Sequence, residues 1–203
     1  MKSKDWTGNK NSVFKTLGAS NHTDKERPSD DYYATDPIAI DVLLNDGNVK
    51  LSEDVWECAA GNGCLSKRLG HYGYNVLSTD LVDRGYGIGG VDFLACTEMF
   101  EGDIITNPPY KLAQEFIQHA LDLIPNGRRV FMFLKIQFLE GKKRRELFDG
   151  GCLKTVYVSS SRILCAKNAD FEGMRKGGGS AVAYGWYEFE KGYKGDTTIK
   201  WIN

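Results

Sequence analysis

The chain has 203 residues, which is enough for one domain with a hydrophobic core. Hydrophobic residues make up 41% and charged residues 26%, a balance typical of a soluble globular protein and not of a disordered one. The net charge of −1 neither requires nor excludes a nucleic-acid partner. No apolar run approaches the roughly 20 residues of a membrane span, and the polar N-terminus lacks a secretory signal. We therefore expect a cytoplasmic protein with no membrane partner.

The cysteines and histidines predict no metal site. Five cysteines are present, an odd number without a C-x-x-C pair, so neither a disulfide framework nor a zinc site is indicated. Reduced thiols in a cytoplasm fit this pattern. His71 and His119 fall on predicted helices without a partner at metal-ligand spacing, and we interpret both as structural.

Residues 1–31 are polar and irregular, and residues 32–203 carry the patterned part of the chain. We expect an N-terminal arm over 1–31 that packs on the domain through its few large apolar residues, Trp6, Val13, Phe14 and Leu17. Thr35-Asp36-Pro37 is a good helix start, a capping side chain followed by proline, and predicts a short helix over Ile38–Leu44.

Strands then alternate with helices. Strands are predicted at 55–58, 75–79, 103–106 and 129–134, and helices at 65–72, 111–123 and 142–148. A glycine-rich loop over 84–90 leads to Val91-Asp92-Phe93, where we expect the third strand to end. This alternation predicts an α/β fold with a mainly parallel, doubly wound sheet.

The C-terminal part breaks the alternation. Thr155–Ser159 and Ser180–Glu190 both have strand patterns, and a loop rich in Gly, Lys and Arg over 167–179 separates them. Without a crossover helix between them, the last strand is expected to enter the sheet antiparallel.

A tetrapeptide follows the apolar strand at 103–106: Asn107-Pro108-Pro109-Tyr110. The two prolines remove two backbone donors and stiffen the turn. The Asn107 side-chain oxygen and the Pro108 carbonyl are thereby free to accept hydrogen bonds from an NH2 group, and Tyr110 offers a flat face to the ring that carries it. The motif predicts a clamp for a planar nitrogen.

The first strand ends in Glu57-Cys58-Ala59-Ala60-Gly61-Asn62-Gly63, a turn that lets the backbone approach a ligand before a helix N-terminus. Asp80 follows about 20 residues later, where a carboxylate can accept both hydroxyls of a ribose. The dinucleotide pattern G-x-G-x-x-G fails because position 66 is serine. Glu57 suits a positive amino group better than a pyrophosphate, which favours S-adenosylmethionine, and Asp92 with Phe93 adds a carboxylate and a ring edge for adenine.

These motifs resemble those of class I S-adenosylmethionine-dependent methyltransferases, and within them the phage-type enzymes that methylate N6 of adenine in DNA. The resemblance covers residues 32–190 and implies a Rossmann-like seven-stranded sheet, a bacterial or phage-infected cell, and S-adenosylmethionine as cofactor. It implies catalytic roles for Asn107, Pro108, Pro109 and Tyr110. It implies cofactor contacts from Tyr33, Thr35, Asp36, Glu57, Ala59, Gly61, Gly63, Asp80, Leu81, Asp92, Phe93 and Asn107.

DNA, single- or double-stranded, is the expected partner. Candidate phosphate contacts are Lys111, Lys142, Lys143, Arg144, Arg145, Arg175 and Lys176, although a solvated helix face is an equal interpretation of the run at 142–145. We expect no separate target-recognition domain in this chain, so sequence specificity would come from the arm, the 167–179 loop, a second copy or a separate subunit, or would be absent. Alternatives are a glutamine N5 protein methyltransferase, an RNA amino-methyltransferase and a non-catalytic binding subunit.

Overall fold

The computed structural model describes residues 33–150, 152–167, 169–176 and 180–203. The predicted arm over 1–31, and Tyr32 at the start of the predicted domain, lie outside the described residues. None of the described helices combines the length and the apolar character that crossing a membrane requires.

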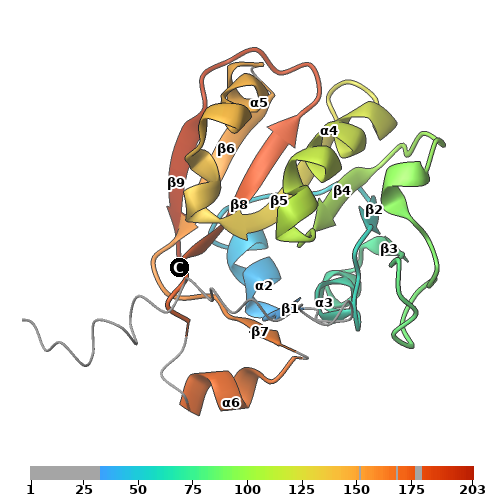
Figure 1. Cartoon of the computed structure of the whole chain (residues 1–203), viewed down its shortest axis with the longest axis vertical. Coiled ribbons are helices and arrows are strands. Elements are labelled where there is room, and N and C mark those ends of the chain that lie inside the picture. Colours follow the sequence, from blue (N-terminus) through green and yellow to red (C-terminus); the bar gives the residue numbers. More distant parts are fainter. Residues whose placement is uncertain (1–32, 151, 168, 177–179) are drawn as a thin grey trace, which may run out of the picture.

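A seven-stranded sheet forms the centre of the molecule (Figure 1). Its strand order is β3-β2-β4-β5-β8-β6-β9, and β8 runs antiparallel to both of its neighbours while all other pairs are parallel. The predicted fold class, a mainly parallel sheet with an antiparallel strand at the end of the predicted series, is confirmed. The strands are β2 (Asp54–Glu57), β3 (Asn75–Ser78), β4 (Asp103–Thr106), β5 (Arg129–Lys135), β6 (Leu153–Ser159), β8 (Tyr184–Glu190) and β9 (Thr198–Ile202).

Helices cover both faces of this sheet (Figure 1). α2 (Ile38–Leu44) and α3 (Cys64–His71) pack on one face, and α4 (Ala113–Leu123) and α5 (Arg145–Asp149) pack on the other. Successive side chains of β5 point to opposite faces of the sheet and so join two different cores. Phe131 and Phe133 belong to the core beneath α2 and α3, whereas Val130 and Met132 belong to the core beneath α4. The sheet is therefore buried on both faces.

Several predicted elements agree with the structure, and others do not. The bounds of α2 and β4 are those predicted, while the helices predicted from Lys111 and Lys142 begin as the 3-10 turns η2 (Tyr110–Leu112) and η4 (Lys142–Arg144). The strand expected before Asp92 is wrong: within the described residues this segment forms one isolated bridge, Thr79 to Ile88, and the 3-10 turn η1 (Phe93–Ala95). Glycines with positive φ at 85, 87 and 90 interrupt extended backbone there.

A second, two-stranded sheet was not predicted. β1 (Tyr33–Thr35) pairs antiparallel with β7 (Cys165–Lys167), so Thr35 lies opposite Cys165. The helix α6 (Phe171–Lys176) follows β7, which corrects the expectation of a loop throughout 167–179 for the residues described. In Figure 1 this small sheet and α6 lie together at one end of the molecule, below α2 and α3. Residues from opposite parts of the chain are thereby brought to one site.

Candidate active site

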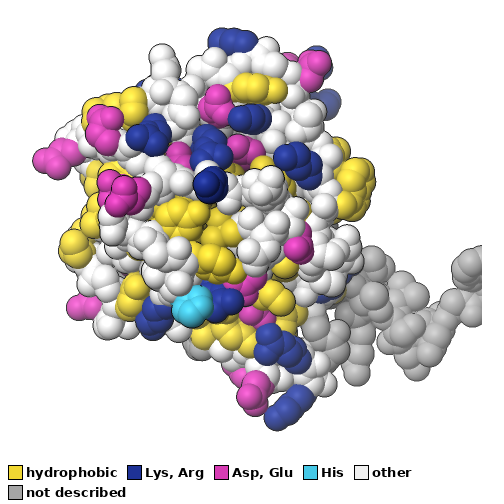
Figure 2. All heavy atoms as spheres, turned by 180° about the vertical axis from the view of Figure 1, so that it is seen from behind, with side chains coloured by type: hydrophobic (Ala, Val, Ile, Leu, Met, Phe, Trp, Pro, Cys, Tyr) yellow, Lys and Arg dark blue, Asp and Glu magenta, His cyan; other side chains and the backbone are white. Residues whose placement is uncertain are grey.

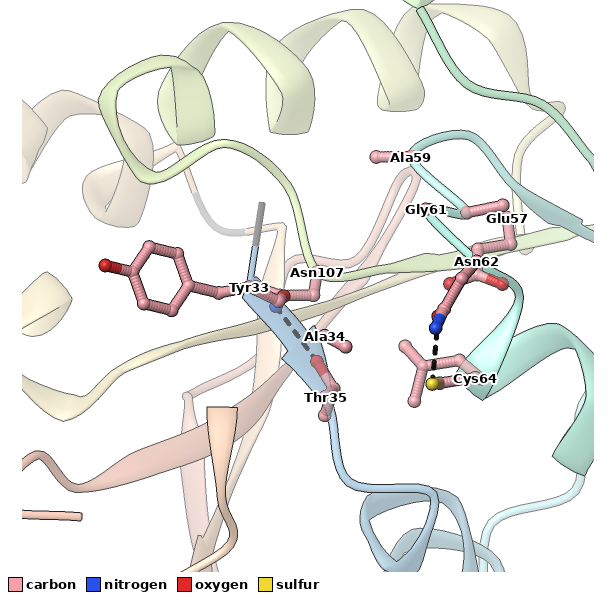
Figure 3. Close-up of a pocket in the computed structure, with 11 residues that line it drawn as sticks. Tyr33, Ala34, Thr35, Glu57, Ala59, Gly61, Asn62, Cys64 and Asn107 are labelled. Atoms are coloured by element: carbon pink, nitrogen blue, oxygen red, sulfur yellow. Dashed lines mark hydrogen bonds between the residues drawn. The ribbon is translucent and has the colours of Figure 1, made fainter. Parts of the chain in front are cut away.

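A pocket opens where β2 and β4 end (Figure 3). Three segments line it: residues 33–35 of β1, the turn and helix start over 57–65, and Asn107 after β4. Parallel neighbours end at the same edge of a sheet, so the glycine-rich turn and the tetrapeptide motif predicted from sequence come together here.

Backbone conformation explains the glycines of the turn. Gly61 and Gly63 have φ values of 58° and 80°, which favour glycine. A Cβ on Gly63 would lie 2.3 Å from the ring of Tyr86, so this position also excludes any side chain for lack of space. The turn is further held by the Ala60 amide, which donates to the Thr79 carbonyl at 3.0 Å. The chain can therefore make a tight turn that exposes its backbone to the pocket.

Asp80 follows β3 beside this turn, as predicted. Its two carboxylate oxygens accept backbone hydrogen bonds from Gly61 and Val82, both at 2.8 Å. Each oxygen keeps a further lone pair for a hydroxyl. Leu81 is 65% exposed next to it and can cover a flat ligand. The carboxylate is thus oriented by the glycine-rich turn over 57–63.

Glu57 is buried at the base of the pocket, with 2% of its surface exposed. The Ser66 hydroxyl donates to its carboxyl, and the Ser78 hydroxyl donates to Ser66 Oγ at 2.7 Å. Burial raises the pKa of Glu57 from 4.5 to about 8, against the smaller opposing effect of the Ser66 hydrogen bond. A carboxyl in this state can be ionised by a cationic group that binds beside it.

The Asn107 side chain has a defined orientation. Its Nδ2 donates to Thr35 Oγ1 at 2.9 Å and to the Tyr33 carbonyl at 3.2 Å (Figure 3). A carbonyl can only accept, so the amide nitrogen belongs on this side and Oδ1 on the other. Among the described residues, Oδ1 is buried without a hydrogen-bond partner. A buried acceptor without a donor indicates a place for a ligand NH group.

The rest of the tetrapeptide supports this arrangement. Pro108 is buried, and within the described part of the chain its carbonyl accepts no hydrogen bond. The Tyr110 hydroxyl is 3.5 Å from Cys165 Sγ, and its ring centroid lies 5.9 Å from that of Tyr184. Burial raises the pKa of Tyr110, and it raises the pKa of Cys165 to about 11, so both stay neutral near pH 7. The thiol is therefore not set up as a nucleophile.

Three of the residues around Tyr110 were not predicted: Cys165 on β7, Tyr184 on β8, and Lys135, whose ammonium lies 5.2 Å from the Tyr110 ring centroid. Cys165 reaches the site through the β1–β7 pairing, which joins positions 130 residues apart. No local pattern marks such a pair. Lys135 could have been found, since it ends a strand beside the tetrapeptide in a parallel sheet.

Other predicted cofactor residues have different surroundings. The Asp36 carboxylate accepts from the Ile38 amide at 3.2 Å, which caps α2, and pairs with Arg175. The Tyr33 ring is 40% exposed and extends away from Glu57 in Figure 3, while its backbone lines the pocket. A role for these two side chains remains a prediction.

Asp92 and Phe93 lie apart from the pocket lining. Asp92 is exposed and caps η1 by accepting from the Leu94 amide at 3.0 Å. Phe93 is buried, and its ring packs against Trp56 and Phe116 with centroids 5.2 Å and 5.0 Å away. The Phe93 side chain is thus part of the core, and its contact with adenine stays a prediction.

Two of the predicted phosphate contacts have internal partners outside their own helix or turn. The Arg144 guanidinium donates to the carbonyls of Gln137 and Glu140, and Arg175 of α6 pairs with Asp36, which lies between β1 and α2. The Arg144 contacts stabilise the segment that follows β5, and the Arg175 ion pair connects α6 to the residue just before α2.

The remaining candidates are exposed. Arg145 and Lys176 each pair with an acid four residues away in the same helix, and Lys111, Lys142 and Lys143 are exposed. On the face in Figure 2, Lys and Arg side chains alternate with Asp and Glu. A nucleic-acid role for this set stays a prediction.

A scan of protein-family models and a search of curated proteins found no match. Solved structures do match. A protein from Lactococcus lactis, provisionally described as a hemolysin, has a TM-score of 0.58 at 9% identity, over 81% of this chain and 91% of that one. A Listeria monocytogenes protein, provisionally described as a class I S-adenosylmethionine-dependent methyltransferase, has a TM-score of 0.53 at 12% identity, over 94% and 70%.

The M protein of the type I restriction enzyme EcoKI has a TM-score of 0.52 at 17% identity, over 81% of this chain and 47% of that protein. This chain therefore spans about half the length of the EcoKI protein. The chain has the fold of class I S-adenosylmethionine-dependent methyltransferases, and at these identities the likeness is to the fold alone.

Proposed function

We propose that this protein transfers a methyl group from S-adenosylmethionine to an exocyclic amino nitrogen, and that the favoured acceptor is N6 of adenine in DNA. One observation carries the proposal: Asn107 is anchored through Nδ2, and its buried Oδ1 has no partner among the described residues. A ligand amino group would supply the donor that this oxygen lacks.

The pocket fits the cofactor by its chemistry. Its lining contains the Glu57 carboxyl and, in the described residues, neither lysine nor arginine, which suits a ligand with an ammonium and no phosphate. Glu57 would face the amino group, the backbone of Ala59 and Gly61 would contact the methionine end, and Asp80 would hold the ribose hydroxyls. When bound, S-adenosylmethionine supplies an electrophilic methyl carbon.

The chain's own groups would prepare the nitrogen. Asn107 Oδ1 and the Pro108 carbonyl accept its two hydrogens, so its lone pair turns away from the ring and toward the methyl carbon. Tyr110, held by Cys165 and Tyr184, provides the surface on which the ring stacks. A strong base is not required before attack because the methylated cation loses a proton readily. The acceptor base is flipped from a duplex or taken from a single strand.

The test uses purified protein, methyl-labelled S-adenosylmethionine and separate unmethylated DNA, RNA and protein fractions, with digestion and mass spectrometry of each. We expect N6-methyladenine from DNA. Label in RNA would reassign the polymer, and N5-methylglutamine would reassign the acceptor. Binding of the cofactor without any transfer would favour a missing specificity subunit or a non-catalytic role.

The Asn107→Ala variant tests the assigned residue. We expect turnover to fall roughly 100-fold or more, by analogy with loss of one preorganised transition-state hydrogen bond, with little change in the Kd of S-adenosylhomocysteine. Asn126→Ala, at an exposed position between α4 and β5, is the matched control and should keep full activity. Loss of cofactor binding in a folded Asn107→Ala protein would contradict the assigned role.

A further inference from the structure

Lys135 is the last residue of β5, and its ammonium contacts the tetrapeptide. Its Nζ lies 5.2 Å from the ring centroid of Tyr110, an arrangement typical of a cation–π contact. The side chain is partly buried, and within the described part of the chain it has no carboxylate partner and no hydrogen-bond acceptor. A partly buried ammonium without an anion is left for a ligand to satisfy.

The position of Lys135 is on the acceptor side of the clamp. β4 and β5 are parallel neighbours, so Lys135 and the Asn107–Tyr110 turn emerge at one edge of the sheet. Lys135 also lies opposite Tyr184, whose ring is beside that of Tyr110. It is absent from the described lining of the Glu57 pocket and adjoins a second pocket, lined by Ile136, Gln137, Leu139, Glu140 and Ala183.

We infer that Lys135 binds a backbone phosphate of a nucleic-acid substrate, next to the base that Asn107 and Tyr110 hold. The inference rests on the proposed function and adds a residue that specifies the polymer. A nucleotide carries a phosphate within reach of its base, whereas a glutamine side chain carries no anion of its own. When a base stacks on Tyr110 and displaces the ammonium from the ring, the phosphate replaces the contact that Lys135 loses.

Salt dependence separates this role from a structural one. Binding of a fluorescent 12-nucleotide single strand with one adenine would be measured by anisotropy, with S-adenosylhomocysteine present, at four salt concentrations. For Lys135→Gln we expect the slope of log K against log salt to decrease by about 0.7, the value for one phosphate contact on a single strand. At the lowest salt we expect binding to weaken about tenfold, as for loss of one charged contact.

Matched variants complete the test. Lys50→Gln changes an exposed lysine ahead of β2, at the opposite edge of the sheet, and should leave slope and affinity unchanged. Lys135→Arg should restore the slope, because it keeps the charge. The Kd of S-adenosylhomocysteine should be the same in all four proteins.

Two results would overturn the inference, and they differ from each other. A Lys135→Gln protein with reduced turnover but an unchanged slope would show that Lys135 only supports the Tyr110 ring. A wild-type protein that methylates glutamine and not nucleic acid would remove the proposed acceptor as well, and this is visible without any variant.

Discussion

The buried carboxyl of Glu57 makes a sharp prediction about stability and pH. In the folded protein burial keeps it protonated up to pH about 8, whereas in the unfolded chain it ionises near its ordinary pKa of 4.5. Between these values the folded state binds more protons than the unfolded state, so stability decreases as pH increases. The full difference between 4.5 and about 8, at about 1.36 kcal/mol per pH unit, is about 5 kcal/mol.

The measurement is urea unfolding at pH 5.5 and pH 8.5. Unfolding is detected by tryptophan fluorescence, to which the buried Trp56 and Trp186 contribute, with 5% and 0% of their surfaces exposed. Between pH 5.5 and pH 8.5 the free energy of unfolding should decrease by roughly 3 kcal/mol more in wild type than in Glu57→Gln. The amide of the variant keeps the shape of the side chain but does not titrate. Comparing the two proteins cancels all other titrating groups. An equal loss in both proteins would refute a protonated Glu57.

The same carboxyl couples cofactor binding to pH if an ammonium binds beside it. The Kd of S-adenosylhomocysteine should then decrease from pH 6 to pH 8 in wild type, as ionised Glu57 becomes easier to form. In Glu57→Gln the Kd should be flat over this range. Isothermal titration calorimetry in two buffers of different ionisation enthalpy would count the released proton directly.

The remaining predictions concern the clamp, the ribose acid and the turn. Thr35→Val removes one acceptor of Asn107 Nδ2, so we expect turnover about tenfold lower with the cofactor Kd unchanged; unchanged turnover would mean that the Tyr33 carbonyl alone orients Asn107. Asp80→Asn should weaken S-adenosylhomocysteine binding about tenfold in calorimetry, and equal affinity would exclude the ribose contact. Gly63→Ala should lower the free energy of unfolding by about 1–3 kcal/mol. Adding Tyr86→Ala removes the clash with the ring and should recover part of this loss; no recovery would assign the loss to backbone strain at φ 80°.

Local patterns account for the part of the fold that sequence could predict. The helix over Ile38–Leu44 and the strand over Asp103–Thr106 were predicted with their observed bounds, because capping residues, prolines and an apolar run mark their ends. The sequence also predicted that the glycine turn, Asp80 and the tetrapeptide lie close together. Each follows a parallel strand, and a parallel sheet aligns those strand ends.

Long-range pairing accounts for what could not be predicted. β1 and β7 have three residues each, too few for a period to be recognised, and their pairing fixes both Thr35 and Cys165 at the clamp. The strand expected before Asp92 is absent from the described residues although the glycine-rich loop over 84–90 was recognised. Its glycines at 85, 87 and 90 have positive φ, and the backbone after them enters the 3-10 turn η1. The orientation of Asn107, which leaves its Oδ1 unpaired among the described residues, depends on β1 and therefore on the β1–β7 pairing.

The location of β8 has a consequence for how the chain folds during synthesis. β8 lies between β5 and β6 in the sheet, but follows both in sequence. On the ribosome, a nascent chain that has emerged only as far as β6 can assemble β3, β2, β4 and β5, yet the outer edge of β5 stays open. Phe131 and Phe133 then lack the cover that Trp186 and its neighbours provide. Completion of the sheet waits for residues 184–190, so the incomplete chain exposes an open strand edge and apolar side chains, the features that make folding intermediates prone to aggregation.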